Sequence, residues 1–215
     1  MTLFVEVNGI RATSARITIP PEGVWTADLS LDVDKAPSSA VTITLADLVL
    51  KGTVIASEGL AGARTLRVLG GAAGWRKIIP AKFYRHAVGV RLSTVLGDAA
   101  RETGETISIA TDVVIGDAFV RMAGPASRLF RHFVETWYMS TNGISIIAAR
   151  PAGVVSGRVE VLSFDGASGR AVLATDTPAQ LVPGRTLTTP TLAKKTLREV
   201  VHTVASELRS EVVFE

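Results

Sequence analysis

The sequence of 215 residues contains no cysteine. Disulfide bonds therefore do not hold the fold, and thiolate metal sites and cysteine nucleophiles are excluded. No apolar run approaches the ~20 residues that a membrane-spanning helix needs, so we expect no membrane insertion. The first residues, MTLFVEVNGIRA, lack the basic start of a signal peptide and alternate as a strand does, which favours synthesis in the cytoplasm.

Motifs for catalysis and cofactor binding are also missing. The glycine-rich stretch LGGAAGW at 69–75 matches no phosphate-binding loop and is interpreted as a turn or a close backbone approach. Glu102 and Glu105 flank a predicted helix end and are interpreted as solvated carboxylates. The histidines belong to no metal-binding pattern, and each is interpreted as a surface or partly buried residue: His86, His132 and His202. We therefore expect no catalytic residue, no metal and no cofactor, and a binding or assembly role rather than an enzyme.

The first ninety residues show the period-two alternation of β-strands. In WTADLSLDV (25–33), apolar side chains occupy every second position and polar side chains lie between them. Stretches rich in turn-forming residues separate the strands, at 20–23, 36–39 and 59–62. Short strands at this spacing indicate a β-barrel or sandwich rather than a doubly wound sheet.

The period changes to that of a helix after residue 90. In GVRLSTVLGDAARETGE (89–105) the apolar residues recur at the spacing of one helix face: Leu92, Val95, Leu96 and Ala99. Ser93 or Thr94 is the predicted N-cap, and Gly104 is the predicted stop. A second short helix is predicted in GPASRLFRHFVE (124–135), with Pro125 at its start and with an apolar stripe of Leu129, Phe130 and Phe133.

A tight hairpin is predicted directly after the second helix, in TWYMSTNGISII (136–147). Asn142-Gly143 between two β-favouring segments indicates a type I′ turn with Gly143 at positive φ. Trp137 opens this hairpin, and we expect it to pack against the helices rather than to bind a ligand. The predicted structural core of this region consists of Leu92, Leu96, Phe130, Phe133 and Trp137.

Period two returns after Pro151. The fold class expected is therefore β-rich α+β, with barrel or sandwich domains and a small helix-and-hairpin α+β insert. The expected domains are an N-terminal β domain over 1–87, the insert over 88–151, and a C-terminal β segment over 152–215 that completes a barrel.

One segment has an unusual charge pattern, because Arg64 to Arg91 contains no Asp or Glu. The segment is either a solvated strand face or a contact with an acidic partner or nucleic acid. It matches no recognised nucleic-acid motif. The candidate interface or anion contacts in it are Arg76, Lys77, Lys82 and Arg85.

The middle of the chain resembles the central module of baseplate hub proteins of tailed bacteriophages, the late-control-D-like group. The resemblance covers roughly residues 88–190. It starts with a leucine-rich helix of the form LxxVLxxxAxxxG and continues with a tryptophan hairpin around an NG turn that ends in RP. The matching residues are Leu92, Val95, Leu96, Ala100, Gly104, Trp137, Asn142, Gly143, Arg150 and Pro151.

This resemblance implies a structural virion protein at the tail tip or baseplate, assembled in the host cytoplasm. Such hubs are trimeric rings that join the tail tube to the central spike or fibre proteins, and their β-domains resemble tail-tube barrels. The expected partners are further copies of the chain, the tail tube, distal tail and spike proteins, and DNA or a tape-measure protein in the lumen. Three segments are candidate edges for subunit pairing: LFVEVNG (3–9), RVEVLSF (158–164) and SEVVFE (210–215).

Two other functions remain open from the sequence. One is another virion β-protein, such as a distal tail, tube or spike protein. The other is a cell-wall-active enzyme or carbohydrate-binding module, in which Trp137 and Tyr138 would form a flat sugar-stacking platform. A ring with extensive subunit interfaces would favour the hub, whereas converging carboxylates in a cleft would favour the enzyme.

Overall fold

The computed structural model describes residues 4–60 and 62–215. Leu3, with which the predicted first strand begins, and Ala61, within the predicted break at 59–62, lie outside the described residues. Strands predominate and the two α-helices are short, so the expected β-rich α+β class is confirmed.

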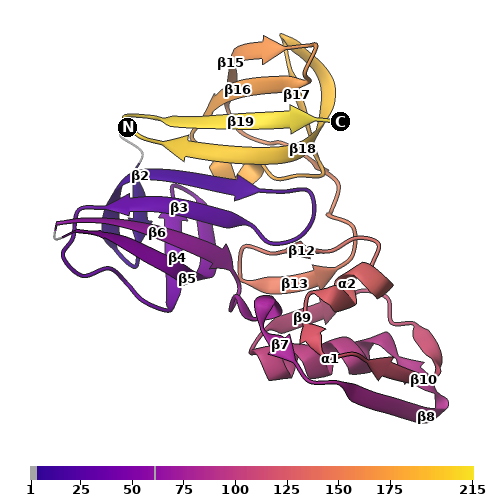
Figure 1. The fold of residues 1–215 in the computed structure, drawn as a ribbon. Helices are drawn as coiled ribbons and strands as arrows, with labels where there is room; N and C mark the ends of the chain where they lie inside the picture. The colour runs from indigo at the N-terminus through magenta and orange to yellow at the C-terminus, as the bar shows by residue number, and fades with distance from the viewer. Residues whose placement is uncertain (1–3, 61) are drawn as a thin grey trace.

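Six strands form a closed barrel at the start of the chain (Figure 1). Neighbouring strands pair in the order β1-β4-β5-β6-β3-β2, and β1 also pairs with β2, so the sheet closes on itself. The strands are β1 (Val5–Val7), β2 (Ile10–Ile19), β3 (Thr26–Leu31), β4 (Ala40–Leu45), β5 (Leu48–Leu60) and β6 (Ala63–Gly70).

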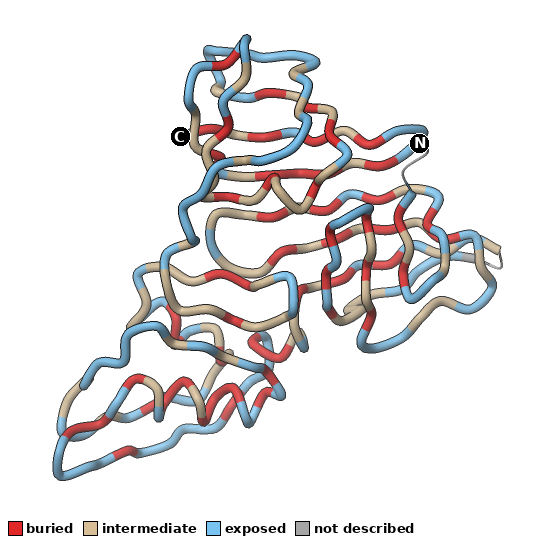
Figure 2. The backbone as a smooth tube through the Cα atoms, turned by 180° about the vertical axis from the view of Figure 1, so that it is seen from behind, coloured by how far each residue is buried: buried red, intermediate tan, exposed pale blue. Residues whose placement is uncertain are grey.

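The alternation read from the sequence decides which side chains fill this barrel. In β3, Ala27, Leu29 and Leu31 are buried, and the residues between them are half-buried. Buried and less buried positions alternate in this way along the strands (Figure 2). Asn8 and Gly9 join β1 to β2 and both have positive φ, 50° and 80°. A two-residue loop with this backbone is the type I′ turn, whose twist matches that of the paired strands.

A second sheet packs around its own apolar cluster, which includes Leu173, Leu187, Leu197 and Val212. Its strands are β14 (Gly153–Val154), β15 (Val159–Asp165), β16 (Arg170–Thr175), β17 (Arg185–Thr189), β18 (Leu192–Val204) and β19 (Leu208–Phe214), with a short 3-10 helix η2 (Pro178–Gln180) before β17. Because β18 pairs with the second half of β2, this sheet continues that of the barrel (Figure 1).

A smaller α+β insert lies between the two β units in sequence and projects to one side (Figure 1). It consists of η1 (Gly74–Arg76), β7 (Ile78–Ile79), β8 (Lys82–Arg91), α1 (Leu92–Thr103), β9 (Thr106–Ile109), β10 (Val114–Arg121), β11 (Gly124–Pro125), α2 (Arg128–Phe133), β12 (Tyr138–Met139) and β13 (Ile144–Ile147). The boundary expected at 87/88 falls inside β8, and the boundary at 151/152 falls between β13 and β14.

Helix α1 has the predicted buried face and the predicted stop. Gly104 follows it with φ 81°, and its amide bonds to Ala100 O. The predicted cap is wrong, because Arg91 occupies the N-cap position and makes no side-chain cap bond. Asp112 caps the helix instead, since its carboxylate accepts the Ser93 amide at 2.9 Å and the Ser93 hydroxyl at 2.7 Å.

Helix α2 is shorter than predicted. Pro125 does not start it, because Gly124 and Pro125 form β11 and pair with Ile79 and Ile78 of β7. Leu129 and Phe130 of the predicted stripe are buried, and Phe133 is half-buried against the same core.

Among the described residues, no helix is both long enough and apolar enough to cross a bilayer.

Candidate functional site

The hairpin of β12 and β13 connects the insert to the barrel. Gly143 has φ 76°, as predicted, but Asn142 does not have a positive φ, so the turn is not type I′. The Gly143 amide bonds to Ser140 O at 3.1 Å, and the Ser140 amide bonds to Ile144 O at 2.9 Å. This is the three-residue loop in which a type I turn is followed by a left-handed glycine.

Backbone hydrogen bonds fasten this hairpin to two barrel segments. The Gly23 amide bonds to Trp137 O at 2.9 Å, and the Met139 amide bonds to Gly23 O at 2.8 Å. The Lys51 amide of β5 bonds to Thr141 O at 2.8 Å. The hairpin follows α2 closely because it joins the helices on one side to the barrel on the other.

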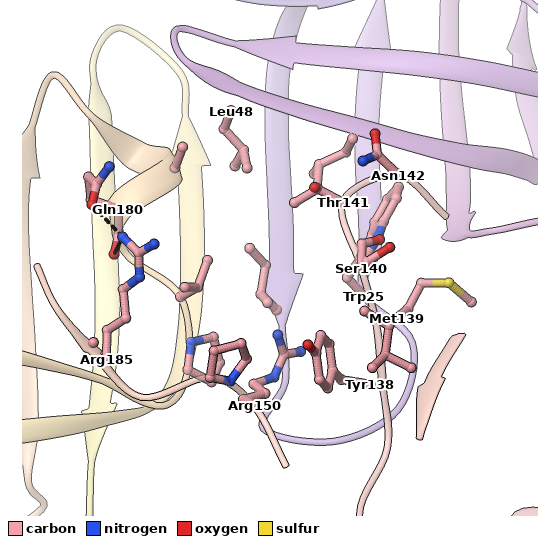
Figure 3. Close-up of a pocket in the computed structure, with 18 of the residues that line it drawn as sticks. Trp25, Leu48, Tyr138, Met139, Ser140, Thr141, Asn142, Arg150, Gln180 and Arg185 are labelled. Atoms are coloured by element: carbon pink, nitrogen blue, oxygen red, sulfur yellow. Dashed lines mark hydrogen bonds between the residues drawn. The ribbon is translucent and has the colours of Figure 1, made fainter. Parts of the chain in front are cut away.

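Arg150, at the end of this region, lies in a pocket of about 770 Å³ between the barrel, the hairpin and the second sheet (Figure 3). Its guanidinium donates to Pro21 O and Pro20 O, both at 2.9 Å, and lies 4.4 Å from the centre of the Tyr138 ring. Burial lowers the pKa of Arg150 to about 10, so the side chain stays charged at neutral pH. These contacts give Arg150 a structural role in which it ties the insert to the β2–β3 turn.

The larger candidate site is a continuous antiparallel sheet of eight strands, in the order β5-β6-β3-β2-β18-β19-β16-β15. Both of its ends have an open edge among the described residues. β15 pairs with β16 alone. β5 pairs with β4 only as far as Thr53, and the Val54 amide still bonds to Ser39 O at 2.9 Å, but the residues of β5 after Val54 pair with β6 alone. Two of the predicted edges are wrong, because β1 and β19 each pair on both sides, whereas RVEVLSF does contain an edge strand.

One face of this sheet covers the apolar cores, and the other is polar. Arg16 lies opposite Asp28 in the register of β2 and β3, and Arg67 of β6 forms an ion pair with Asp28 at 3.7 Å. Charges of both signs continue across β18, β19 and β16, with Glu199, Arg209, Glu211 and Arg170. A wide sheet with one polar face and two open edges is suited to form part of a solvated wall.

The four predicted anion contacts lie along η1, β7 and β8 but do not form one free cationic site. The Lys77 ammonium donates to Thr103 O at 2.8 Å, and Lys82 pairs with Asp98. The side chains of Arg76 and Arg85 are exposed and form no hydrogen bond or ion pair with the residues that the structure describes.

Asp98, the partner of Lys82, belongs to a charged cluster under β8. Burial favours its neutral form, but the Lys82 ammonium and the Arg101 guanidinium outweigh burial and keep the pKa of Asp98 below its ordinary value. Arg121, whose side chain is buried, donates to Glu102 at 2.7 Å. Lys82 is therefore engaged within the chain rather than available to a partner.

The other polar candidates have structural roles. Glu105 is buried rather than solvated, and it accepts the Gly74 amide at 2.6 Å and the Ala72 amide at 3.2 Å. Glu105 therefore holds the glycine-rich loop in place. The loop is interpreted from the sequence as a turn or a close backbone approach, and Gly74 does approach the backbone of Thr103 closely.

The histidines are interpreted from the sequence as surface or partly buried residues. His86 and His132 are exposed, but this interpretation is wrong for His202, which is fully buried. Within 4–60 and 62–215, no His, Cys, Asp and Glu side chains gather as a metal site.

Sequence comparison identifies no relative, because no family model and no curated protein matches the chain. Comparison with solved structures finds proteins of similar fold. The chain resembles the 43 kDa tail protein of prophage MuSo2 from Shewanella oneidensis, with a TM-score of 0.67 and 9% identity over 100% of this chain and 98% of that chain. It also resembles a tail protein from Neisseria meningitidis MC58, with a TM-score of 0.63 and 10% identity over 100% and 96%.

The chain has the fold of these tail proteins. A third similar structure is the E. coli c3393 protein, a component of the type VI secretion system described as structurally similar to the T4 tail proteins gp27 and gp5. That match has a TM-score of 0.64 and 10% identity, and covers 98% of this chain and 75% of the other. Because the likeness extends over nearly the whole chain, the barrel, the insert and the second sheet are shared together.

Proposed function

We propose that this protein is a structural component of a phage tail, a tail-tip or baseplate hub that forms a ring between the tail tube and the central spike or fibre proteins. The observation that carries the proposal is the eight-strand sheet with one polar face and an open edge at each end. The fold shared with phage tail proteins supports the same role.

The open edges explain how a ring would form. Unpaired amides and carbonyls on an exposed edge form hydrogen bonds with a strand of another chain. If β15 of one subunit pairs with the later part of β5 in the next, the contact is head-to-tail, and a rotation that closes produces a ring. The polar face with Arg16, Asp28 and Arg67 then lines the lumen. The resemblance to phage hubs favours three subunits, with the tube, distal tail and spike proteins at the ends and DNA or a tape-measure protein inside.

The insert does not support a sugar-binding function. Tyr138 is buried, and Trp137 stacks on Phe130, so the two rings do not form a flat exposed platform. We expect no catalytic turnover of peptidoglycan, nucleic acid or peptides. Reproducible turnover that is lost when Glu102, Glu105 or His132 is replaced would favour an enzyme instead.

The mass of the native assembly tests the ring. We expect light scattering and native mass spectrometry to give a closed oligomer, and Leu162→Lys to give monomer, because Leu162 is exposed on the β15 edge and lysine on an edge opposes pairing. Val49→Lys, at an exposed apolar residue of similar accessibility away from that open edge, is the matched control and should assemble as the parent does. A parent chain that stays monomeric when mixed with the other tail proteins would contradict the proposal.

A further inference from the structure

Exposed apolar side chains gather on the β8–β10 ribbon of the insert. Phe83 is 62% exposed, Val120 52% and Met122 75%. Val88 of β8 is also exposed, as is Ile78 of β7, which precedes the ribbon in the chain. Figures 1 and 2 both place this ribbon at the end of the molecule farthest from the second sheet. Exposed apolar side chains that cluster in this way mark an interaction surface.

The alternation of the two strands puts these side chains on one face. Phe83 lies directly opposite Val120, and Tyr84 lies opposite Phe119. Tyr84 is buried on the side of α1, so Phe83 and Val120 face away from the helix. Met122 directly follows β10, two residues after Val120, and is also exposed. We call the side chains of Phe83, Val120 and Met122 the outer face of the ribbon.

Basic residues border this outer face. Arg85 is on the same side of β8 as Phe83, opposite Ala118 of β10. Arg76 and Lys77 are exposed before β7 in the chain, although the Lys77 ammonium already donates to Thr103 O. β8 itself lies in the acid-free segment 64–91. Only one acidic residue, Asp117, lies in β8 and β10, so the charge of the ribbon is mainly positive. The acids beneath β8 are already neutralised within the chain.

The outer face is small for a stable protein interface. β8 has 10 residues, so at ~3.3 Å per residue and ~5 Å between strands the face of the ribbon covers roughly 300 Å². A stable protein interface buries ~800 Å² on each partner. A lipid surface has no such minimum, because a few apolar side chains inserted among the headgroups, together with cations near anionic lipids, are sufficient for weak, reversible binding.

We propose that the outer face of the β8–β10 ribbon binds the surface of an anionic lipid membrane. Phe83, Val120 and Met122 enter the headgroup region, and Arg85 contacts lipid phosphates. The contact is peripheral, and a single chain has the complete surface. In a ring, identical ribbons project in a symmetric set, so weak single contacts combine into a stronger one.

Flotation with vesicles tests this proposal on the full chain. We expect the protein to float with vesicles of phosphatidylglycerol and phosphatidylcholine in equal parts, and to stay unbound with phosphatidylcholine alone. Binding at about 50 mM salt should be lost at about 500 mM salt, where charges are screened within ~4 Å. The double variant Phe83→Ser/Met122→Ser should bind at least about tenfold more weakly, because it loses two inserted apolar side chains. Arg85→Gln should bind about fivefold more weakly.

Val154→Ser is the matched control, because Val154 is 68% exposed but lies in β14, outside the ribbon. It should float as the parent does, and all variants should keep the parent Tm. Failure of the parent to float with anionic vesicles, or equal binding by the double variant, would overturn the proposal. If the parent does not bind vesicles but binds a tail protein, and the double variant loses that binding, the surface belongs to the protein contact instead. Light scattering of the same samples tests the ring separately, because variants of the ribbon should form the same oligomer as the parent.

Discussion

The indole of Trp137 lies flat on the ring of Phe130, with ring centroids 4.1 Å apart and planes inclined by 11°. Phe130 also meets Trp75 edge-on, with centroids 4.6 Å apart. The rings of Trp137, Phe130 of α2 and Trp75 of η1 therefore form one aromatic cluster. The carbonyl of Trp137 at the same time accepts the amide of Gly23 from the barrel. This residue thus contributes to both sides of the junction between insert and barrel.

Replacing Trp137 with alanine should lower the free energy of unfolding by about 2–4 kcal/mol, because a large, partly buried ring and its stacking on Phe130 are lost. Urea unfolding followed by circular dichroism measures this change. Trp137→Phe retains a stacked ring and should lose much less. If Trp137→Ala kept the parent stability but lost binding to a glycan, the residue would be a ligand platform rather than a packing residue.

Gly143→Val should destabilise the hairpin and weaken its attachment to the barrel. Valine strongly disfavours φ 76°, and a Cβ atom on Gly143 would lie 3.0 Å from Lys51 O. We expect a loss of about 2 kcal/mol or more. Gly97→Ala is the matched control, since a Cβ atom at Gly97 in α1 would have nothing within 4 Å. Alanine there should raise the free energy of unfolding by up to about 1 kcal/mol. Equal Tm values for Gly143→Val and the parent would disprove this constraint.

Asp112→Ala should destabilise α1 by about 1 kcal/mol, the usual cost of losing a helix cap. The hydroxyl and then the amide of Ser93 hold the pKa of Asp112 below its ordinary value, so the cap should weaken on acidification as well. Hydrogen exchange of the first-turn amides of α1 measures the effect residue by residue. Asp117→Ala, a change at a nearby exposed acid, should leave that exchange unchanged. Faster exchange in both variants alike would show that the cap is not the cause.

Stability should fall in mild acid because of His202. Its Nδ1 lies 2.8 Å from Ser210 Oγ, while Nε2 is buried without a partner among the described residues. Burial lowers the pKa of His202 from 6.5 to about 4. The unfolded chain therefore binds the proton first, and the stability present above pH 6.5 is lost as the pH falls toward about 4, up to about 3 kcal/mol.

Urea unfolding at a series of pH values compares the parent with His202→Leu. Because replacing a buried histidine also changes the absolute stability, the comparison uses the slope of the unfolding free energy with pH. This slope should be smaller for the variant than for the parent between about pH 4 and 6.5. His132→Asn, which removes an exposed histidine, should keep the parent slope. Parallel slopes for the parent and His202→Leu would contradict the assignment.

Local signals in the sequence were sufficient for the types of most elements. The period-two stretches became strands, and the spacing of Leu92, Val95 and Leu96 became the buried face of α1. Gly104 ended that helix because a left-handed stop depends on the residue itself and its near neighbours. These features were predictable because their energies come from side chains a few positions apart.

Tertiary contacts decided the rest. Asp112 replaced the local cap across 19 residues of sequence separation, and pairing with β7 drew Pro125 into a strand. The N-terminal strand is not an edge because β1 finds partners on both sides once the barrel closes. The open edges at β5 and β15 lie at the two ends of one sheet because β2 pairs with β18, and the proposed ring depends on that arrangement. Hydrogen bonds between strands distant in the chain select these partners, and no local pattern contains that information.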